Sequence, residues 1–419
     1  MKITQFTIIK SVIFLIILGY ISLAPNNTNL SKVDAFLVLV LSVFIIIRSR
    51  KNLPLTVMFI FILYVNYSIV IGEYFVGGYL SVPFTEVKTE EIYSLTIRVM
   101  LLFISVIALF YNGKKFDVIN DKLKLRDNWI LFYLAICALI FALIIGVDRG
   151  DYESYGVRIS PIFEYGKILF LFAFFYSGEL KVRKLIIIFL IVIYILQDAL
   201  YGGRVTSLQL IIFLAVTIFS NKLSLIKILI CSFLGIGLLS TVGFYRNSYE
   251  LTGFSIISLI NNLINNYFVF DTATYAYYAS ATHVAAAESV DILIRLQSLY
   301  QFTISIFLGS QDISSDVTSF VVSLGFFNMG GGVMPTHFYF WLGWSGVIII
   351  GFIVVFLINN LKYNSVYQHL LLLGIIINVP RWYLYSPNQF FRGVLFLVTI
   401  LFLVFGILRE QTIKRRLLK

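Results

Sequence analysis

The sequence predicts a polytopic, all-α membrane protein with about twelve transmembrane helices. Three observations predict this fold class: the composition, the recurrence of long apolar runs, and the placement of basic residues between those runs. Of the 419 residues, 59% are hydrophobic and only 13% are charged, and the mean hydropathy is +0.93. Because a water-soluble domain cannot bury so much apolar surface, the composition excludes a soluble fold.

Apolar runs recur from Ile8 to Leu408 with no long polar linker between them. A helix needs about 20 apolar residues to cross the hydrocarbon, and fewer where flanking residues snorkel. On this criterion the predicted spans are residues 5–23, 33–47, 53–72, 92–111, 128–147, 160–179, 185–202, 205–220, 226–244, 336–358, 366–380 and 390–408. We therefore expect residues 1–419 to form a single integral membrane domain.

The basic residues predict the orientation of these spans, because lysine and arginine are retained on the cytoplasmic side. They cluster in alternate loops, at residues 48–51, 114–126, 181–184, 222–227 and 414–416. This alternation predicts that both termini are cytoplasmic (N-in, C-in). It also accounts for the net charge of +11 without a nucleic-acid partner, since the basic residues form short clusters between apolar runs.

One predicted outer loop, residues 247–335, is much longer than the others, and long loops often carry function. Within it, residues 254–264 place apolar positions at helical spacing, which predicts a short helix at the membrane interface. Residues 328–335 contain three consecutive glycines and a proline, so we expect no regular helix there. The chain shows no convincing internal repeat, which disfavours the transporter folds built from two repeated halves.

Several arginines lie where the topology does not explain them, in outer loops, at the outer ends of spans or within a span. They are Arg98, Arg149, Arg158, Arg204, Arg246, Arg295, Arg381 and Arg392. A guanidinium can hold phosphate oxygens bidentately, which a lysine ammonium cannot do. A single arginine could instead snorkel to lipid headgroups or pair with a nearby carboxylate. For the whole set, a bound anion at the outer face is the better interpretation, with Arg204 and Arg246 as the strongest pair.

The histidines differ in their surroundings along the chain. His283 and His369 stand alone in the sequence, and we expect both to be structural. His337 follows the glycines and opens a predicted span, so it either packs or caps the helix, or it transfers a proton. Residues 330–332 themselves either allow close helix packing or form an anion-binding nest of backbone N–H groups.

Metal and disulfide chemistry receives no support from the sequence. The two cysteines, Cys137 and Cys231, both lie inside apolar runs. No histidine has a second ligand at metal-binding spacing. We therefore expect neither a metal site nor a cofactor.

Three short motifs carry a resemblance to a known family. They are Gly202-Gly203-Arg204, Phe244-Tyr245-Arg246, and Gly330 to Pro335 followed by Gly343-Trp344-Ser345-Gly346. In their order and topological position they resemble the bacterial oligosaccharide repeat-unit polymerases, the O-antigen polymerase (Wzy-like) family, and more distantly the O-antigen ligases. The resemblance covers the whole architecture, while each motif by itself is short.

The resemblance implies a metal-independent membrane glycosyltransferase, similar in type to the GT-C enzymes, without a cofactor. Its substrates would be undecaprenyl-pyrophosphate-linked glycans, joined at the periplasmic face of the bacterial inner membrane to make O-antigen or capsule polysaccharide. A chain-length regulator would be a further candidate partner. Two alternatives stay open: a lipid-linked oligosaccharide flippase or transporter, to which the mid-span charges Arg98 and Lys167 point, and an O-antigen ligase.

The same resemblance assigns roles to individual residues. Arg204 and Arg246 match the arginines expected to hold the pyrophosphate, and Arg149, Arg158 and Arg381 are further candidates for that site. His337 resembles the ligase histidine and is the preferred base, with Glu250, Asp151, Glu153 and Asp271 as the other outer-face candidates. Tyr275 and Tyr278, with Tyr277 and Tyr300 nearby, either stack on sugar rings or anchor the chain at the membrane interface.

Overall fold

The computed structural model of the chain describes residues 5–26, 28–74, 89–113, 125–145, 161–200, 205–220, 224–232, 234–235, 271–326, 328, 330–361 and 365–417. Within these ranges the regular elements are helices, apart from one isolated bridge between Asp127 and Ser177. The all-α prediction is therefore confirmed for the described part of the chain. Of the ninth predicted span only the first part is described, and the interfacial helix predicted at residues 254–264 lies outside the described residues.

The first eight helices overlap the first eight predicted spans. They are α1 (Gln5–Leu23), α2 (Thr28–Ser49), α3 (Leu53–Tyr74), α4 (Glu90–Phe110), α5 (Trp129–Ile145), α6 (Pro161–Tyr176), α7 (Lys181–Leu200) and α8 (Val205–Val216). The later elements are α11 (Asp271–Ser289), α12 (Ile292–Leu308), η4 (Ile313–Ser315), α13 (Val317–Ser323), α14 (Met334–Leu342), α15 (Trp344–Asn360), α16 (Val366–Ile377), α17 (Val379–Trp382), α18 (Asn388–Phe390), the π-helical turn η5 (Phe391–Phe396) and α19 (Leu397–Leu417).

Three helical stretches are long and apolar enough to cross a membrane, namely Leu30–Ser49, Glu90–Phe110 and Asn388–Glu410. Several shorter apolar helices accompany them, and many large apolar side chains are exposed on the outside of the bundle, among them Ile16 and Phe36. Such a surface is compatible with a membrane protein. The number of crossings and their direction remain predictions.

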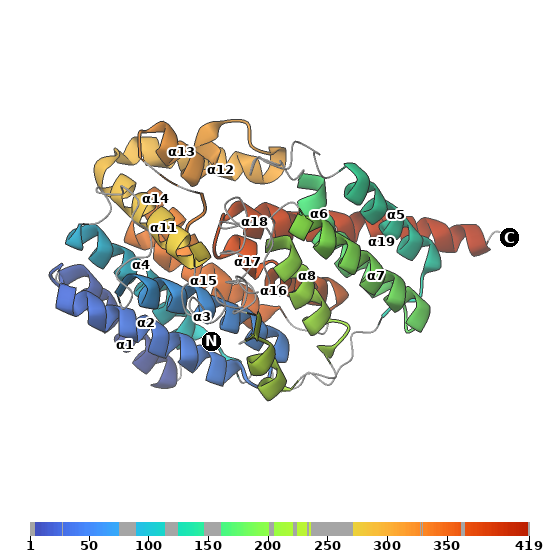
Figure 1. Cartoon of the computed structure of the whole chain (residues 1–419), viewed down its shortest axis with the longest axis horizontal. Helices are drawn as coiled ribbons and strands as arrows, with labels where there is room; N and C mark the ends of the chain where they lie inside the picture. Colours follow the sequence, from blue (N-terminus) through green and yellow to red (C-terminus); the bar gives the residue numbers. More distant parts are fainter. Residues whose placement is uncertain are drawn as a thin grey trace, which may run out of the picture.

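The helices form two groups with a central layer between them (Figure 1). Helices α1 to α4 lie with α11 to α15 in one group, and α5 to α8 lie with α19 in the other. Helices α16 and α17 stand between the groups, where both touch α3 on one side and α8 on the other. The segment that follows, through α18 and η5, is also packed between elements of both groups.

Two predicted spans are broken helices, which is where the structure departs from the sequence expectation. The span predicted at residues 336–358 divides at Gly343, whose φ of 61° no other residue type adopts readily. Helix α16 ends before Pro380, which lacks the N–H that would continue it. Irregular backbone at membrane depth is tolerated only where protein buries it or where it lines a cavity, so both breaks are candidates for function.

The long loop predicted at residues 247–335 contains more structure than the short helices we expected. Helix α11 has 19 residues and α12 has 17. Residues 276–287 of α11 are buried, and the helix packs against α3, α4 and α14. Hydropathy missed this helix because it is rich in alanine, serine and threonine, which let helices approach closely without raising the hydropathy.

Candidate functional site

The structure describes only some of the residues predicted to form the site. Arg149, Arg158, Arg204, Arg246, Asp151, Glu153 and Glu250 lie outside the described residues. Tyr275 and Asp271 belong to α11, but their side chains are not described. The predicted site residues that the structure places in full are therefore Arg381, His337 and Tyr278.

Arg381 lies on α17, in the irregular segment between the two helix groups. Its Nη2 is 2.5 Å from Oε1 of Glu164 on α6, and the side chains are 20% and 19% exposed. The guanidinium also lies over the ring of Tyr385, 5.3 Å from its centroid. Its Nε is buried and has no hydrogen-bond partner among the described residues. The group therefore retains an unused donor and a partly open face.

A chain of hydrogen bonds runs inward from Glu164 and ties this segment to α6 and α8. The second carboxylate oxygen of Glu164 accepts from Nε2 of Gln389, at 3.1 Å. The backbone oxygen of Gln389 accepts from Nδ2 of Asn378, at 2.7 Å. Asn378 in turn accepts from Gln209, whose Oε1 lies 3.1 Å from Nζ of the fully buried Lys167. The network holds α17 and α18 in place without a regular helix.

The end of α7 and the start of α8 meet at the same place. Asp198 accepts from both the backbone N and the Oγ of Ser207, each at 2.8 Å, and these bonds join the two helices. Asp198 also lies within electrostatic reach of Arg381 and Glu164. The contact thus fixes the start of α8, which directly follows Arg204 in the sequence.

Arg392 is the second arginine at this site, and it was not among the residues predicted to bind the pyrophosphate. It lies in the π-helical turn and is half-buried, and no described carboxylate lies within ion-pair distance of it. Its guanidinium rests against Gly309, where a Cβ would come within 2.9 Å of Nη1. Arg392, Arg381 and Glu164 all lie within electrostatic reach of the Tyr165 hydroxyl. Among the described residues, the site therefore has a cation without an acidic partner.

His337 is fully buried in α14, where it faces a second histidine. The ring centroids of His283 and His337 are 4.3 Å apart and the ring planes are inclined by 55°. His283 stands alone in the sequence, but α11 brings it across the bundle to His337. Neither ring nitrogen of His337 has a hydrogen-bond partner among the described residues, although the backbone of Gly332 and Tyr385 lies beside the ring.

The histidine pair and the arginine segment are joined along their backbones. The N–H of Gly332 donates to the carbonyl of Leu384 at 3.1 Å, and the N–H of Met334 donates to the carbonyl of Tyr383 at 2.8 Å. Tyr385 follows directly, with its backbone beside His337 and its ring beneath Arg381. The predicted base and the predicted phosphate ligand therefore lie on two sides of one tyrosine.

No protein-family model, curated protein or solved structure matches the chain. Arg381 and Arg392 provide two positive charges near the carboxylate of Glu164, and Lys167 and Asp198 lie close to them. This arrangement suits an anion. No group of three or more His, Cys, Asp and Glu residues that could hold a metal occurs in the part of the chain that the structure describes.

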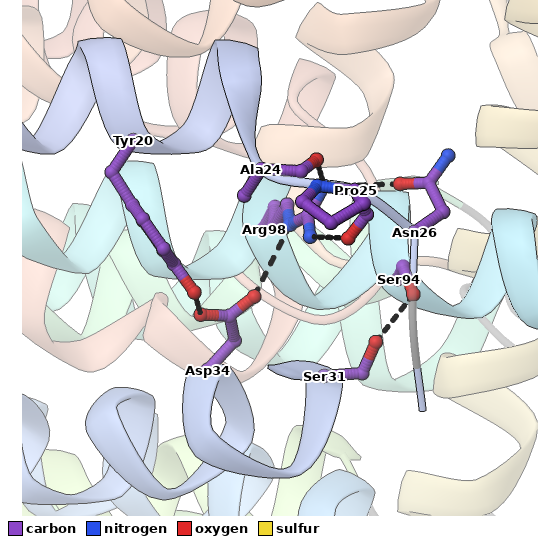
Figure 2. A network of polar contacts seen from close by, with 8 residues as sticks. All are labelled: Tyr20, Ala24, Pro25, Asn26, Ser31, Asp34, Ser94 and Arg98. Atoms are coloured by element: carbon purple, nitrogen blue, oxygen red, sulfur yellow. Dashed lines mark hydrogen bonds and ion pairs between the residues drawn. The ribbon is translucent and has the colours of Figure 1, made fainter. Parts of the chain in front are cut away.

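Two other candidates belong to the packing of the bundle instead. Arg98 pairs with Asp34 at 3.2 Å and donates to the carbonyls of Ala24 and Pro25, at 2.8 and 2.6 Å (Figure 2). The second carboxylate oxygen of Asp34 accepts from Tyr20. This arginine therefore anchors the end of α1 to α2 and α4, and it is not available to a ligand.

Tyr278 is only 3% exposed and its ring meets that of Tyr277 edge-on, with centroids 5.5 Å apart. In this conformation the ring contacts neighbouring side chains and not a sugar. Sequence reasoning missed Glu164, Gln389 and Tyr385 entirely. The signal that could have found the last two is the pair of prolines, Pro380 at the end of the eleventh predicted span and Pro387 shortly before the twelfth.

Proposed function

We propose that the protein is a polymerase that joins undecaprenyl-pyrophosphate-linked oligosaccharide repeat units at the outer face of the bacterial inner membrane. The observation that carries the proposal is the arginine segment: Arg381 keeps a partly open face and Arg392 has no acidic partner among the described residues. A half-buried guanidinium without a carboxylate is costly unless an anion binds it. A pyrophosphate ester is an anion that suits two adjacent arginines.

In the proposed reaction a hydroxyl of the acceptor glycan attacks the anomeric carbon of the donor. The glycosidic bond forms while the bond from that carbon to the pyrophosphate oxygen breaks. Negative charge then develops on the departing pyrophosphate, and Arg381 and Arg392, held in place by the fold, would stabilise it. The acceptor proton would pass to His337, on the other side of Tyr385.

The grouping of helix ends supports the proposed orientation. The start of α6, the end of α7, the start of α8 and the end of α16 meet around the arginine segment, and all four are ends that the basic-residue pattern predicts to face outward. At an end predicted to face the cytoplasm, Arg48 donates to the carbonyl of Ala108, and Asn359 bonds the backbone of Phe110 and Asn112. The two sets of ends stay separate, as an alternating topology requires.

One observation favours a transporter as a second candidate. Helices α14 to α15 and α16 to α19 are interrupted, and a fully buried lysine, Lys167 of α6, bonds Gln209 of α8 beside the central layer. Transporters use interrupted helices and buried charges at the contact between two bundles. The polymerase remains the better proposal because the arginine without a carboxylate lies at a helix end and not along the middle of the bundle.

A strain that lacks the native protein and carries a variant tests the proposal. Arg381→Ala and Arg392→Ala should abolish long glycan chains while single capped repeats persist on a gel, and Arg204→Ala and Arg246→Ala should do the same. Arg50→Ala, an exposed arginine in a predicted cytoplasmic loop, is the matched control and should give normal ladders. Loss of all capped product would instead indicate a ligase, and lipid-linked repeats trapped in the cytoplasmic leaflet would indicate a flippase.

A further inference from the structure

The two buried histidines form a pair of which the proposed reaction uses only one member. Gly332 covers both rings: a Cβ at this position would lie 2.9 Å from Nδ1 of His283 and 3.4 Å from Nε2 of His337. The two nitrogens therefore border the same small space. That space is open because residue 332 has no side chain, and the backbone φ of 120° keeps a glycine there.

The hydroxyl groups around His283 are arranged as proton acceptors. Thr318 donates its only hydroxyl hydrogen to the carbonyl of Gly331, at 2.9 Å, and Thr336 donates its own to the carbonyl of Val333, at 2.8 Å. Each threonine oxygen therefore offers only lone pairs to the imidazole, Thr318 at Nε2 and Thr336 at Nδ1, both at 3.4 Å. Nδ2 of Asn328 faces Nε2 of His283 at 3.3 Å, while Oδ1 of Asn328 accepts from the N–H of Gly330. Because an amide nitrogen only donates, Nε2 accepts this bond, and the proton of the neutral ring lies on Nδ1, directed at Thr336.

The surroundings of His337 are different. Its ring nitrogens lack a side-chain partner, and the nearby groups are the backbone of Gly332 and Tyr385 and the negative charge of Asp316, which caps the start of α13. His337 packs against the ring of His283, which is therefore placed to fix its orientation.

We propose that His283 positions His337 to take the proton of the acceptor hydroxyl, an inference that rests on the proposed polymerase function. The ring of His283 packs against that of His337, and its bonds to Thr336 and Asn328 hold it in place. The acceptor oxygen forms the glycosidic bond, the donor's bond to pyrophosphate breaks, and the hydroxyl proton passes to His337 and from there to water. His283 is a positioning residue, because it acts on the substrate through His337.

Steady-state kinetics of the purified full-length protein with a lipid-linked repeat test this role. His283→Asn should lower kcat by roughly 10- to 100-fold and change KM by less than about twofold. His283→Gln should recover part of that loss, because its amide can still donate toward a threonine. The double variant with His337→Asn should be no slower than His337→Asn alone, since both side chains serve one step. His369→Asn is the control histidine and should keep the wild-type kcat.

A second readout does not depend on activity. The chain has only three histidines, so ring ¹⁵N labelling gives few signals to assign. His337→Asn should shift the ¹⁵N resonances of His283 and leave those of His369 unchanged. Unchanged His283 resonances, or a wild-type kcat in His283→Asn, would overturn the pairing. A wild-type protein that makes no polymer but shows the resonance shift would instead overturn the proposed function and leave the paired histidines in place.

Discussion

Arg381 and Glu164 form an ion pair 2.5 Å long in which about a fifth of each side chain stays exposed, at 20% and 19%. The pair between Arg98 and Asp34, by contrast, is 2% and 0% exposed and surrounded by further hydrogen bonds. Both arginines have an acidic partner, yet only Arg381 has a face that a ligand can reach. This difference separates a binding group from a structural one.

Substitution of Arg381 should raise KM for the lipid-linked substrate, whereas substitution of Glu164 should not. Arg381→Ala removes a charged hydrogen-bond donor worth about 1.5 to 3 kcal/mol, so KM for the lipid-linked substrate should rise by roughly 10- to 100-fold. Glu164→Gln removes the carboxylate that competes for the guanidinium, so KM should stay equal or fall. Initial rates of the purified variants measure both values, with Arg50→Ala as the control. A KM that rises to the same extent in both variants would show that the ion pair itself, and not a free guanidinium, is needed.

Arg98 should be essential for stability and not for binding. Arg98→Ala leaves the carboxylate of Asp34 buried without its cation, which costs on the order of 3 to 5 kcal/mol. We therefore expect a large fall in Tm of the purified protein in detergent. Replacing both partners, as Arg98→Met with Asp34→Leu, should recover much of the loss, because no charge is then left unpaired. A double variant as unstable as the single one would contradict this explanation.

Gly332→Ala and Gly330→Ala are a matched pair of variants that tests the role of the space between the two histidine rings. Both glycines have positive φ, 120° and 95°, so alanine at either position costs about 1 to 2 kcal/mol in backbone strain. Only at Gly332 would the new Cβ also collide with His283, at 2.6 Å from Cε1, whereas nothing lies within 4 Å of a Cβ at Gly330. Gly332→Ala should therefore lower both Tm and kcat further than Gly330→Ala. Equal effects in the two variants would mean that the space between the rings has no role.

The predicted orientation can be measured by cysteine labelling. The two native cysteines, Cys137 and Cys231, are exposed and must first be replaced by alanine. In that background Lys32→Cys, in a predicted outer loop, should react with a membrane-impermeant maleimide added to intact spheroplasts. Arg50→Cys, in a predicted cytoplasmic loop, should react only after lysis, because the N-in arrangement shields it. The reverse pattern would invert the topology and place the arginine segment inside the cell.

Hydropathy predicted most helices because crossing a bilayer requires a long apolar run, and α1 to α8 lie where such runs occur. It missed α11, which is buried through small residues, and it merged α14 with α15 because an apolar run does not reveal a break at Gly343. Of the predicted irregular segment 328–335, residues 330–332 are irregular with positive φ, whereas Met334 and Pro335 already belong to α14.

The candidate site was only partly predictable. Arginine placement pointed to Arg381, but the meeting of His283 with His337 depends on how α11 packs against α14, and a single sequence carries no signal for such a contact. Likewise, Arg392 was noted as an outer arginine, yet its lack of an acidic partner among the described residues is a property of packing. The sequence shows which residues are charged, whereas the partner of each charge depends on how the helices pack.

The most direct test of the central claim, that Arg381 and Arg392 hold a lipid-linked pyrophosphate, uses purified protein in vesicles with one synthetic undecaprenyl-pyrophosphate repeat unit and EDTA. We expect the wild-type protein to build a ladder of polymers, and the double variant Arg381→Ala with Arg392→Ala to build none while keeping its Tm within a few degrees of the wild type. A wild-type ladder from the folded double variant would contradict it.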